Sequence, residues 1–248
     1  MDDALYPSRW NLKGAAIAAL IIVLWALSLV ILLSVEMAAL PGWVIVVAVA
    51  GQTMLYTGLF ITGHDAMHST VTPGYPRLNN AVGRLSAALY ALFSYRRLCR
   101  AHWMHHDHPV SGEDPDYHGH DGAGPVRWYL RFMREYLSVV QLLGMAAVFN
   151  ILQHLVGVAV INLIIFWVIP ALLSTVQLFY FGTYLPHRRP AEGYEEPHRA
   201  TSNDFAPWLS FLSCYHFGYH REHHERPDLP WWRLPRYRKL LYQSGAKR

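Results

Sequence analysis

Charged residues are scarce in this sequence, and cysteine is nearly absent. Asp, Glu, Lys and Arg make up 15% of the 248 residues, whereas apolar residues make up 53%. This balance differs from that of soluble domains and predicts a membrane protein. The two cysteines, Cys99 and Cys214, are too few for a disulfide framework or a zinc-thiolate site. The net charge is +4, but the basic residues flank long apolar runs, so we expect no nucleic-acid binding.

Motifs of several common enzyme classes are also missing. The sequence has no G-x-S-x-G elbow, no phosphate-binding glycine loop and no dinucleotide fingerprint. A bound nicotinamide or flavin is therefore not indicated, and electrons for any redox reaction must come from a partner protein. The basic surface expected on the cytoplasmic side could dock an acidic partner, but attraction to anionic lipid accounts better for Arg236, Arg238 and Lys239.

Long uncharged runs predict the membrane spans. About 20 apolar residues cross a bilayer, and the charge-free stretch from Leu137 to Pro186 has room for two crossings joined by a turn. The predicted spans are 14–35, 43–62, 137–155 and 161–184. We therefore expect an all-α integral membrane protein with four transmembrane helices, forming one domain over residues 1–248.

The distribution of Lys and Arg predicts the orientation of these spans. All 21 lie before the first span, between the second and third, or after the fourth. Because Lys and Arg concentrate in cytoplasmic segments, both termini and the regions 63–135 and 187–248 are expected to be cytoplasmic. Region 63–135 is interpreted as a large loop with a helix around Leu85–Phe93, lying in the membrane interface or in the extramembrane core.

Histidine is the residue that stands out. Three clusters occur in the expected cytoplasmic regions, and residues three or four apart share one face of a helix, so each cluster can present several imidazoles in one direction. The clusters are His64 and His68, then His102, His105 and His106, then His220, His223 and His224.

This number of histidines indicates two metal ions. Neutral imidazole is a common ligand for iron, copper, nickel and zinc, and one tetrahedral ion takes about four protein ligands at most. Because zinc has no redox chemistry and structural zinc sites favour the thiolates that are scarce here, a pair of irons is the most economical assignment. The spacing itself supports metal binding, not iron in particular.

Other polar residues near the clusters are candidates for the same site. His187 follows the fourth span, and we expect it to be a further ligand. His216 lies four residues before His220, so it would be a ligand or the partner of one if that helix extends upstream. A ligating histidine usually donates its second ring N–H to an acceptor, and the candidate carboxylates are Asp65, Asp114, Asp116 and Glu222.

The histidine boxes resemble those of the membrane fatty-acid hydroxylase and desaturase superfamily. Further segments look like the bacterial β-carotene ketolases within it, and the similarity covers nearly the whole chain, from about Leu55 to Trp232 in motifs and throughout in the order of the spans. These segments are Gly63–His68, Asp114–His118, Phe181–Arg188 and Cys214–His224.

The resemblance implies a non-haem di-iron oxygenase that uses O₂ to insert oxygen at C4 of a β-ionone ring. Asp65 and Asp116 are the expected catalytic carboxylates, the substrate is a carotenoid from the bilayer, and the electron donor is an external, ferredoxin-like protein. The metal ligands implied are His64, His68, His102, His105, His106, His187, His220, His223 and His224.

Three alternatives remain open at this point. The same iron site could act on a fatty chain, as a desaturase or hydroxylase, or at C3 of a carotene, although carotene 3-hydroxylases have four residues inside the first box and this sequence has three. A membrane metal transporter or storage protein is the non-enzymatic alternative. Transporters place ionisable residues near the bilayer midplane, and the predicted spans contain almost none.

Overall fold

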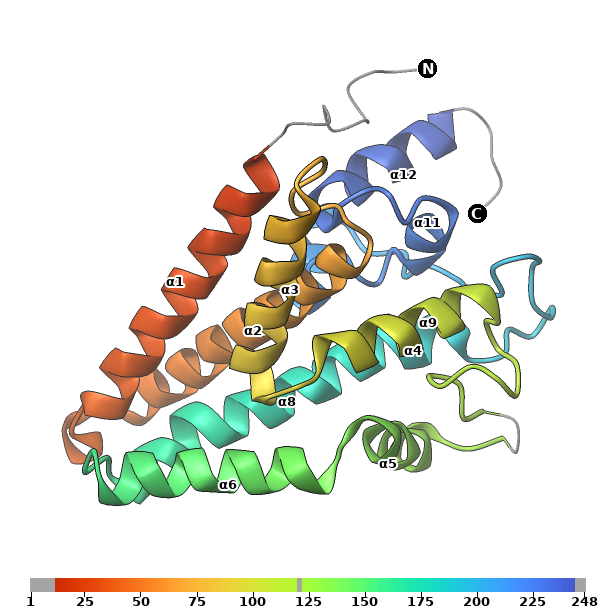
Figure 1. Ribbon diagram of the computed structural model, residues 1–248. Coiled ribbons are helices and arrows are strands. Elements are labelled where there is room, and N and C mark those ends of the chain that lie inside the picture. Colours follow the sequence, from red (N-terminus) through yellow and green to blue (C-terminus); the bar gives the residue numbers. More distant parts are fainter. Residues whose placement is uncertain (1–11, 120–121, 244–248) are drawn as a thin grey trace.

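The computed structural model describes residues 12–119 and 122–243, which fold as an assembly of helices (Figure 1). Strands are absent from these ranges, so the expected all-α class is confirmed for them. The first half contains α1 (Lys13–Ser34), η2 (Met37–Ala39), α2 (Gly42–Met67), α3 (Pro76–Ala91), α4 (Tyr95–Asp107), α5 (Pro125–Tyr136) and α6 (Val139–His154). The second half contains α7 (Val160–Asn162), η3 (Leu163–Val168), α8 (Ile169–Leu178), η4 (Phe179–Tyr184), α9 (Leu185–His187), α10 (Pro207–Cys214), α11 (His220–Glu225), η5 (Trp231–Arg233) and α12 (Leu234–Gln243).

Three helices within the described ranges are long and apolar enough to cross a membrane. They are α1, α2 and the unbroken helix Val160–His187, in which η3 and η4 are π-helical turns. A fourth crossing requires that α5 and α6 count as one span, and these two helices meet at 87°. The described residues thus contain three candidate spans, or four with the bent pair.

Two helices continue beyond the ends predicted for the second and fourth spans. Helix α2 continues past residue 62 to Met67 and takes the first histidine cluster with it, so that His64 lies in the helix and His68 at its C-cap. No proline interrupts this segment, and its polar end is covered by α3, which packs along α2. The last span likewise continues to His187.

Region 63–135 is not one large loop, as was expected, but contains three helices. Pro76 and Pro125 occupy the first turns of α3 and α5, where a missing N–H costs nothing. Leu92 ends α3 in a left-handed conformation, and the Ser94 hydroxyl then caps α4 by accepting from the Arg97 amide. The expected helix around Leu85–Phe93 is the second half of α3.

Apolar side chains cover the outside of the bundle as well as its core. On α1, exposed residues such as Leu20, Leu27 and Ile31 form a surface that is stable against lipid but not against water. The core joins the spans through Trp25, Tyr56 and other buried residues. Helices α6 and η3 lie side by side, with the rings of Phe149 and Trp167 stacked 6.2 Å apart (Figure 1).

Polar groups inside the bundle satisfy one another. The Thr57 hydroxyl lies 2.9 Å from that of Ser174 and donates to Gln177 at 2.6 Å, and the Tyr90 hydroxyl donates to Ser174 at 3.1 Å. The Gln177 amide donates in turn to the Ser213 carbonyl at 2.6 Å. Such bonds stabilise contacts between helices where lipid offers no alternative partner. They link α2, α3 and α8 to α10.

The C-terminal segment packs against this bundle. At Gly182 of η4, an added Cβ would lie 2.2 Å from the Phe217 ring, so only glycine permits this close approach. Phe217 in turn lies edge-on to His64, with ring centroids 4.8 Å apart. This contact brings α11 to the ends of α2 and α4.

Candidate metal centre

Eight histidines of the described chain form two groups, each able to hold one metal ion. Within each group the four ligand nitrogens lie within 4.8 Å of one another. The first group is His64, His68, His102 and His223. The second group is His105, His187, His220 and His224, and all four are buried.

The two groups do not correspond to the sequence clusters. Helix α4 gives His102 to the first group and His105 to the second, because residues three apart diverge enough to face neighbouring sites. Helix α11 likewise gives His223 to the first group and His220 and His224 to the second. Each of these short helices therefore contributes to both sites, which places the sites next to each other.

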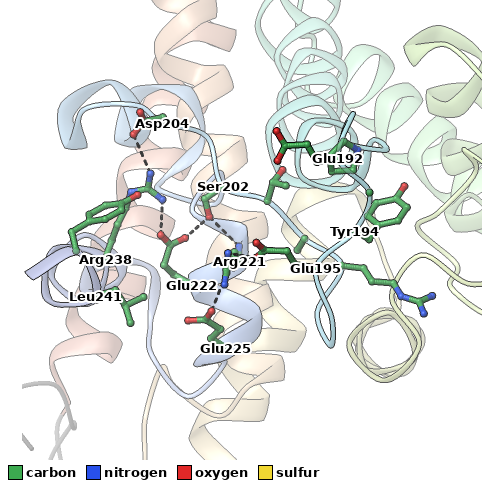
Figure 2. A pocket seen from close by; sticks show the side chains of 16 residues that line it. Glu192, Tyr194, Glu195, Ser202, Asp204, Arg221, Glu222, Glu225, Arg238 and Leu241 are labelled. Atoms are coloured by element: carbon green, nitrogen blue, oxygen red, sulfur yellow. Dashed lines mark hydrogen bonds and ion pairs between the residues drawn. The ribbon is translucent and has the colours of Figure 1, made fainter. Parts of the chain in front are cut away.

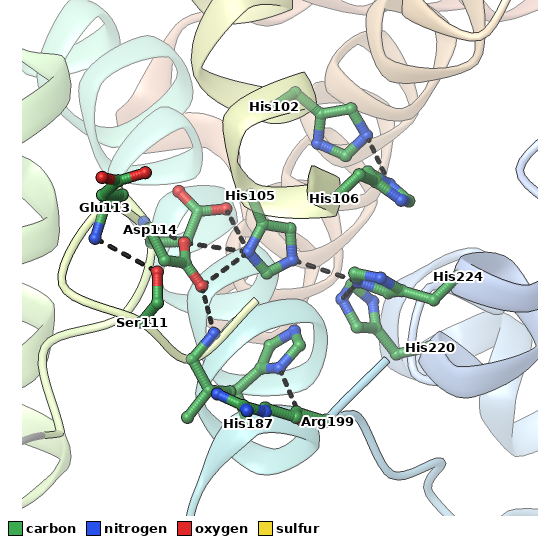
Figure 3. Close-up of polar contacts among 12 residues, drawn as sticks. His102, His105, His106, Ser111, Glu113, Asp114, His187, Arg199, His220 and His224 are labelled. Carbon is green, nitrogen blue, oxygen red and sulfur yellow. Dashed lines mark hydrogen bonds and ion pairs between the residues drawn. The ribbon is translucent and has the colours of Figure 1, made fainter. Parts of the chain in front are cut away.

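His106 lies between the two groups. Its Nε2 is 3.1 Å from that of His102 and 3.0 Å from that of His223, both in the first group. Its ring stacks on His224 of the second group, with centroids 4.2 Å apart. All nine histidines expected as ligands are therefore in one continuous cluster, part of which is seen in Figure 3.

The donor set fits two first-row metal ions. The Nε2 atoms of His64 and His187 are buried and have no hydrogen-bond partner in the protein, a costly arrangement unless another ligand satisfies them. Elsewhere Nε2 atoms face each other, at 2.6 Å for His68 and His102 and at 3.1 Å for His105 and His224. Lone pairs that converge on one point are what a cation at about 2 Å from each nitrogen would bind.

Burial keeps most of these imidazoles neutral, which is the form that binds metal. It lowers the pKa of His68 to about 3 and holds the pKa values of His102, His220 and His223 well below the ordinary value. Repulsion between neighbouring imidazoles adds to this effect at His102, His220 and His223. Protons therefore do not compete strongly for these sites near neutral pH.

His105 differs because it has a carboxylate partner. Burial acts to lower its pKa, but the charge and hydrogen bond of Asp114, together with the charge of Asp116, raise it above the ordinary value. Asp114 also accepts from the amides of Val110 at 2.8 Å and Asp116 at 2.9 Å, which hold the carboxylate in place. Figure 3 shows Asp114 on the side of the ring opposite His224.

His187 has a backbone partner. Its Nδ1 lies 3.2 Å from the Arg199 carbonyl oxygen, to which it can only donate. That bond places the proton on Nδ1 and leaves Nε2 as the ligating atom.

An apolar cavity of about 70 Å³ reaches both groups of histidines. We call it the inner cavity. Phe60, Phe93 and Phe132 line it, together with His64 and His102 of the first group and His105 and His220 of the second.

Asp116 is the carboxylate in this lining. It accepts a hydrogen bond from the Tyr136 hydroxyl and lies 4.0 Å from Nδ1 of His105. Burial raises the pKa of Asp116 to about 6, against the opposing effect of His105.

The other candidate carboxylates have different surroundings. Asp65 accepts from the Trp231 amide at 3.1 Å and lies 3.4 Å from Nδ1 of His64, so it ties the end of α2 to the C-terminal segment. Glu222 is on α11 but accepts hydrogen bonds from Ser202 and Arg238 (Figure 2). It therefore holds α11 against α12.

His216 does not share a helix with His220, so the upstream extension of that helix, on which a role of His216 as a ligand depended, is absent. Helix α11 begins at His220, and His216 itself has a φ of +62°, in the left-handed region. Its ring stacks on Tyr219, with centroids 5.6 Å apart, and lies near Trp231. His216 thus belongs to an aromatic cluster beside the metal centre and to neither histidine group.

Comparison with known proteins places the chain in a class. The family model described as fatty acid desaturase matches residues 41–148 and 134–248. The chain belongs to the fatty acid desaturase family, as the histidine boxes predicted.

Within that family the chain is similar to carotenoid ketolases. It is 45% identical over 195 residues to the β-carotene ketolase of Paracoccus sp. (strain PC1), covering 78% of this chain and 79% of that protein. It is 44% identical over 186 residues to the β-carotene ketolase of Paracoccus sp. (strain N81106 / MBIC 01143), covering 75% of each. The zeaxanthin 4-ketolase of Chlamydomonas reinhardtii is 40% identical in an alignment of 251 positions, gaps included, that covers 94% of this chain and 55% of that protein.

Proposed function

We propose that this protein is a membrane oxygenase that converts the C4 methylene of β-carotene rings into a ketone, giving echinenone and then canthaxanthin. The observation that carries the proposal is the inner cavity, an apolar space whose lining includes histidines of both metal groups. The relatives named for β-carotene ketolase activity support the substrate. An apolar ring could enter such a cavity directly from a bilayer.

Nine histidines would hold the two irons: the two groups of four, with His106 joining them. Two bound irons supply the O₂-derived oxidant needed to break a C–H bond beside an alkene. The aromatic lining excludes water and holds the ring with its C4 toward the histidines. Each hydroxylation consumes one O₂, two electrons and two protons and releases one water, and a second hydroxylation at C4 gives a gem-diol that loses water to form the ketone.

Asp116 is the proposed catalytic carboxylate. It is the acidic group in the inner cavity, and its hydrogen bond from Tyr136 holds it there. Asp116 can therefore accept a hydrogen bond from the C4 hydroxyl left by the first oxidation and retain that product for the second. For Asp65, whose partners are His64 and Trp231, we propose a positioning role in place of the catalytic one expected from the sequence.

The membrane arrangement is part of the same proposal. Counting α5 and α6 as one bent crossing gives four spans, which would place both termini and the histidine cluster in the cytoplasm with the Lys and Arg segments. Arg127, Arg131 and Arg134 of α5 would then lie at the cytoplasmic end of that crossing. The whole chain would then be one domain. Electrons would come from a separate donor protein of the ferredoxin type.

The test is expression in a host that accumulates β-carotene. Ketone groups conjugated to the polyene shift its absorption to the red, and each one replaces two hydrogens by one oxygen in the mass spectrum. Unchanged β-carotene in cells that contain the iron-loaded protein would refute the proposal. A desaturated or hydroxylated acyl chain, or a 3-hydroxylated ring, would identify the alternative substrates instead.

A further inference from the structure

A second apolar cavity, of about 370 Å³, lies between α6 and the helix formed by η3 and α8. We call it the outer cavity. Helix α6 lines it with residues one turn apart, including Leu142, Ala146 and Asn150, and the facing helix lines it with Val168, Ala171 and Leu172. The lining is almost entirely apolar.

The outer cavity adjoins the inner one. Four residues line both cavities: Tyr90, Phe93, Met133 and Thr175. At its other side the outer cavity is bounded by exposed apolar residues, including Leu142 and Leu172, which are each 53% exposed. The two cavities therefore follow one another from the apolar surface of the bundle, between α6 and α8, to the histidines, with the four shared side chains at their junction.

We propose that the outer cavity binds the polyene chain of the substrate while one ring occupies the inner cavity. This inference rests on the proposed function. A carotenoid is a ring joined to a long, rigid, apolar chain, so a ring seated at the histidines needs an apolar path for the rest of the molecule. The outer cavity provides such a path, and Phe149 and Trp167 in its lining offer aromatic faces to a conjugated chain.

The substrate ring can pass the junction between the two cavities only if a side chain there moves. The inner cavity, at about 70 Å³, is smaller than a substituted cyclohexene ring, so a side chain must move as the ring enters. Met133 lies at the junction and is unbranched and flexible, so it can move at low cost. The substrate would thus enter ring first, with its second ring left toward the lipid.

Two neighbouring alanines on α6 give a matched test. Ala146 and Ala147 are both exposed, but only Ala146 lines the outer cavity. Ala146→Trp fills the path and should lower conversion of β-carotene about tenfold or more, the scale of a steric mismatch in an apolar pocket. Ala147→Trp places the same side chain beside the path and should convert β-carotene like the wild type.

A short substrate separates a blocked path from a damaged site. β-Ionone carries the same ring on a short side chain, so Ala146→Trp should convert it as well as the wild type does, with the same bound iron. Equal conversion of β-carotene by the two variants would overturn the inference, and so would an equal loss on both substrates in Ala146→Trp. If wild-type protein with bound iron converts neither substrate, the proposed function itself fails. If the wild type converts β-carotene but not β-ionone, the conversion of β-carotene by Ala146→Trp and Ala147→Trp still tests the inference.

Discussion

Nδ1 of His105 lies 3.0 Å and 3.1 Å from the two carboxylate oxygens of Asp114. A carboxylate only accepts, so the imidazole donates from Nδ1, and its Nε2 lone pair is directed toward the second histidine group. Two amides fix the carboxylate in turn. The orientation of a ligand in the middle of the cluster thus depends on a loop residue nine positions further along the chain.

Asp114→Asn should lower iron affinity or activity about 10- to 100-fold, because an amide no longer fixes the His105 tautomer. Iron per protein and conversion of β-carotene measure the effect. Glu113→Gln is the control, since Glu113 is an exposed neighbour that pairs with His108. Normal iron content and activity in Asp114→Asn would contradict this role.

Removal of a ligand should have a larger effect than removal of its partner. His105→Ala and His223→Ala each take one ligand from a different group, so both should abolish activity and reduce bound iron. His154→Ala, at the end of α6, should change neither. Full activity in both ligand variants would refute the site, and metal analysis of purified protein provides the measurement.

Asp116→Asn should change the product ratio more than the iron content. A hydrogen bond to a charged group contributes about 1.5–3 kcal/mol, against about 0.5–1.5 kcal/mol for a neutral one, so replacing the carboxylate by an amide oxygen should raise the share of 4-hydroxylated product about fivefold. Tyr136→Phe, which keeps the carboxylate, should have a smaller effect. An unchanged ratio of hydroxyl to ketone products in Asp116→Asn, measured by chromatography, would exclude the proposed contact.

The ion pair of Glu222 and Arg238 is nearly buried, and the Arg238 guanidinium also lies 4.6 Å above the Tyr219 ring. Arg238→Met leaves the carboxylate buried without its cation, which costs about 3–5 kcal/mol and should lower the melting temperature clearly. Arg226→Met removes a more exposed pair with Asp228 and should cost at most about 1 kcal/mol. Equal melting temperatures of the two variants would show that Glu222 is not held in this way.

His216 predicts a dependence of stability on pH. Burial lowers its pKa to about 4, whereas an unfolded histidine titrates near 6.5. Between these values the unfolded state binds more protons, so stability falls as the pH drops from about 6.5 to 4. His216→Gln should remove on the order of 1 kcal/mol of this loss at pH 5 and leave bound iron at pH 7 unchanged. A loss of iron at pH 7 would instead identify His216 as a ligand.

Local spacing explains how much of the site could be predicted. Histidines three or four apart are detectable in any sequence, and so are uncharged runs, which is why the clusters and the helical class were found. The assignment of His102 and His105 to different groups could not be predicted from the sequence, because it depends on where α4 meets α9 and α11. Glu222 has the same sequence proximity to ligands as Asp65, yet it faces Ser202 and Arg238.

Helix ends were the least predictable part of the fold. Polar residues at 63–67 suggested that α2 had ended, but α3 buries them and the helix continues. His216 shows the opposite case, because a left-handed residue at that position breaks the helix that its spacing suggested. Both outcomes depend on contacts with distant segments.

The sharing of α11 between the two groups has a consequence for biogenesis. Before residues 220–224 have been synthesised, the first group has three of its four histidines and the second only His105 and His187. Iron loading should therefore follow translation of almost the whole sequence and insertion of its helices. Each ion would then fasten the last helix of the centre to segments made much earlier, so a chain interrupted before α11 would enter the membrane without its metals.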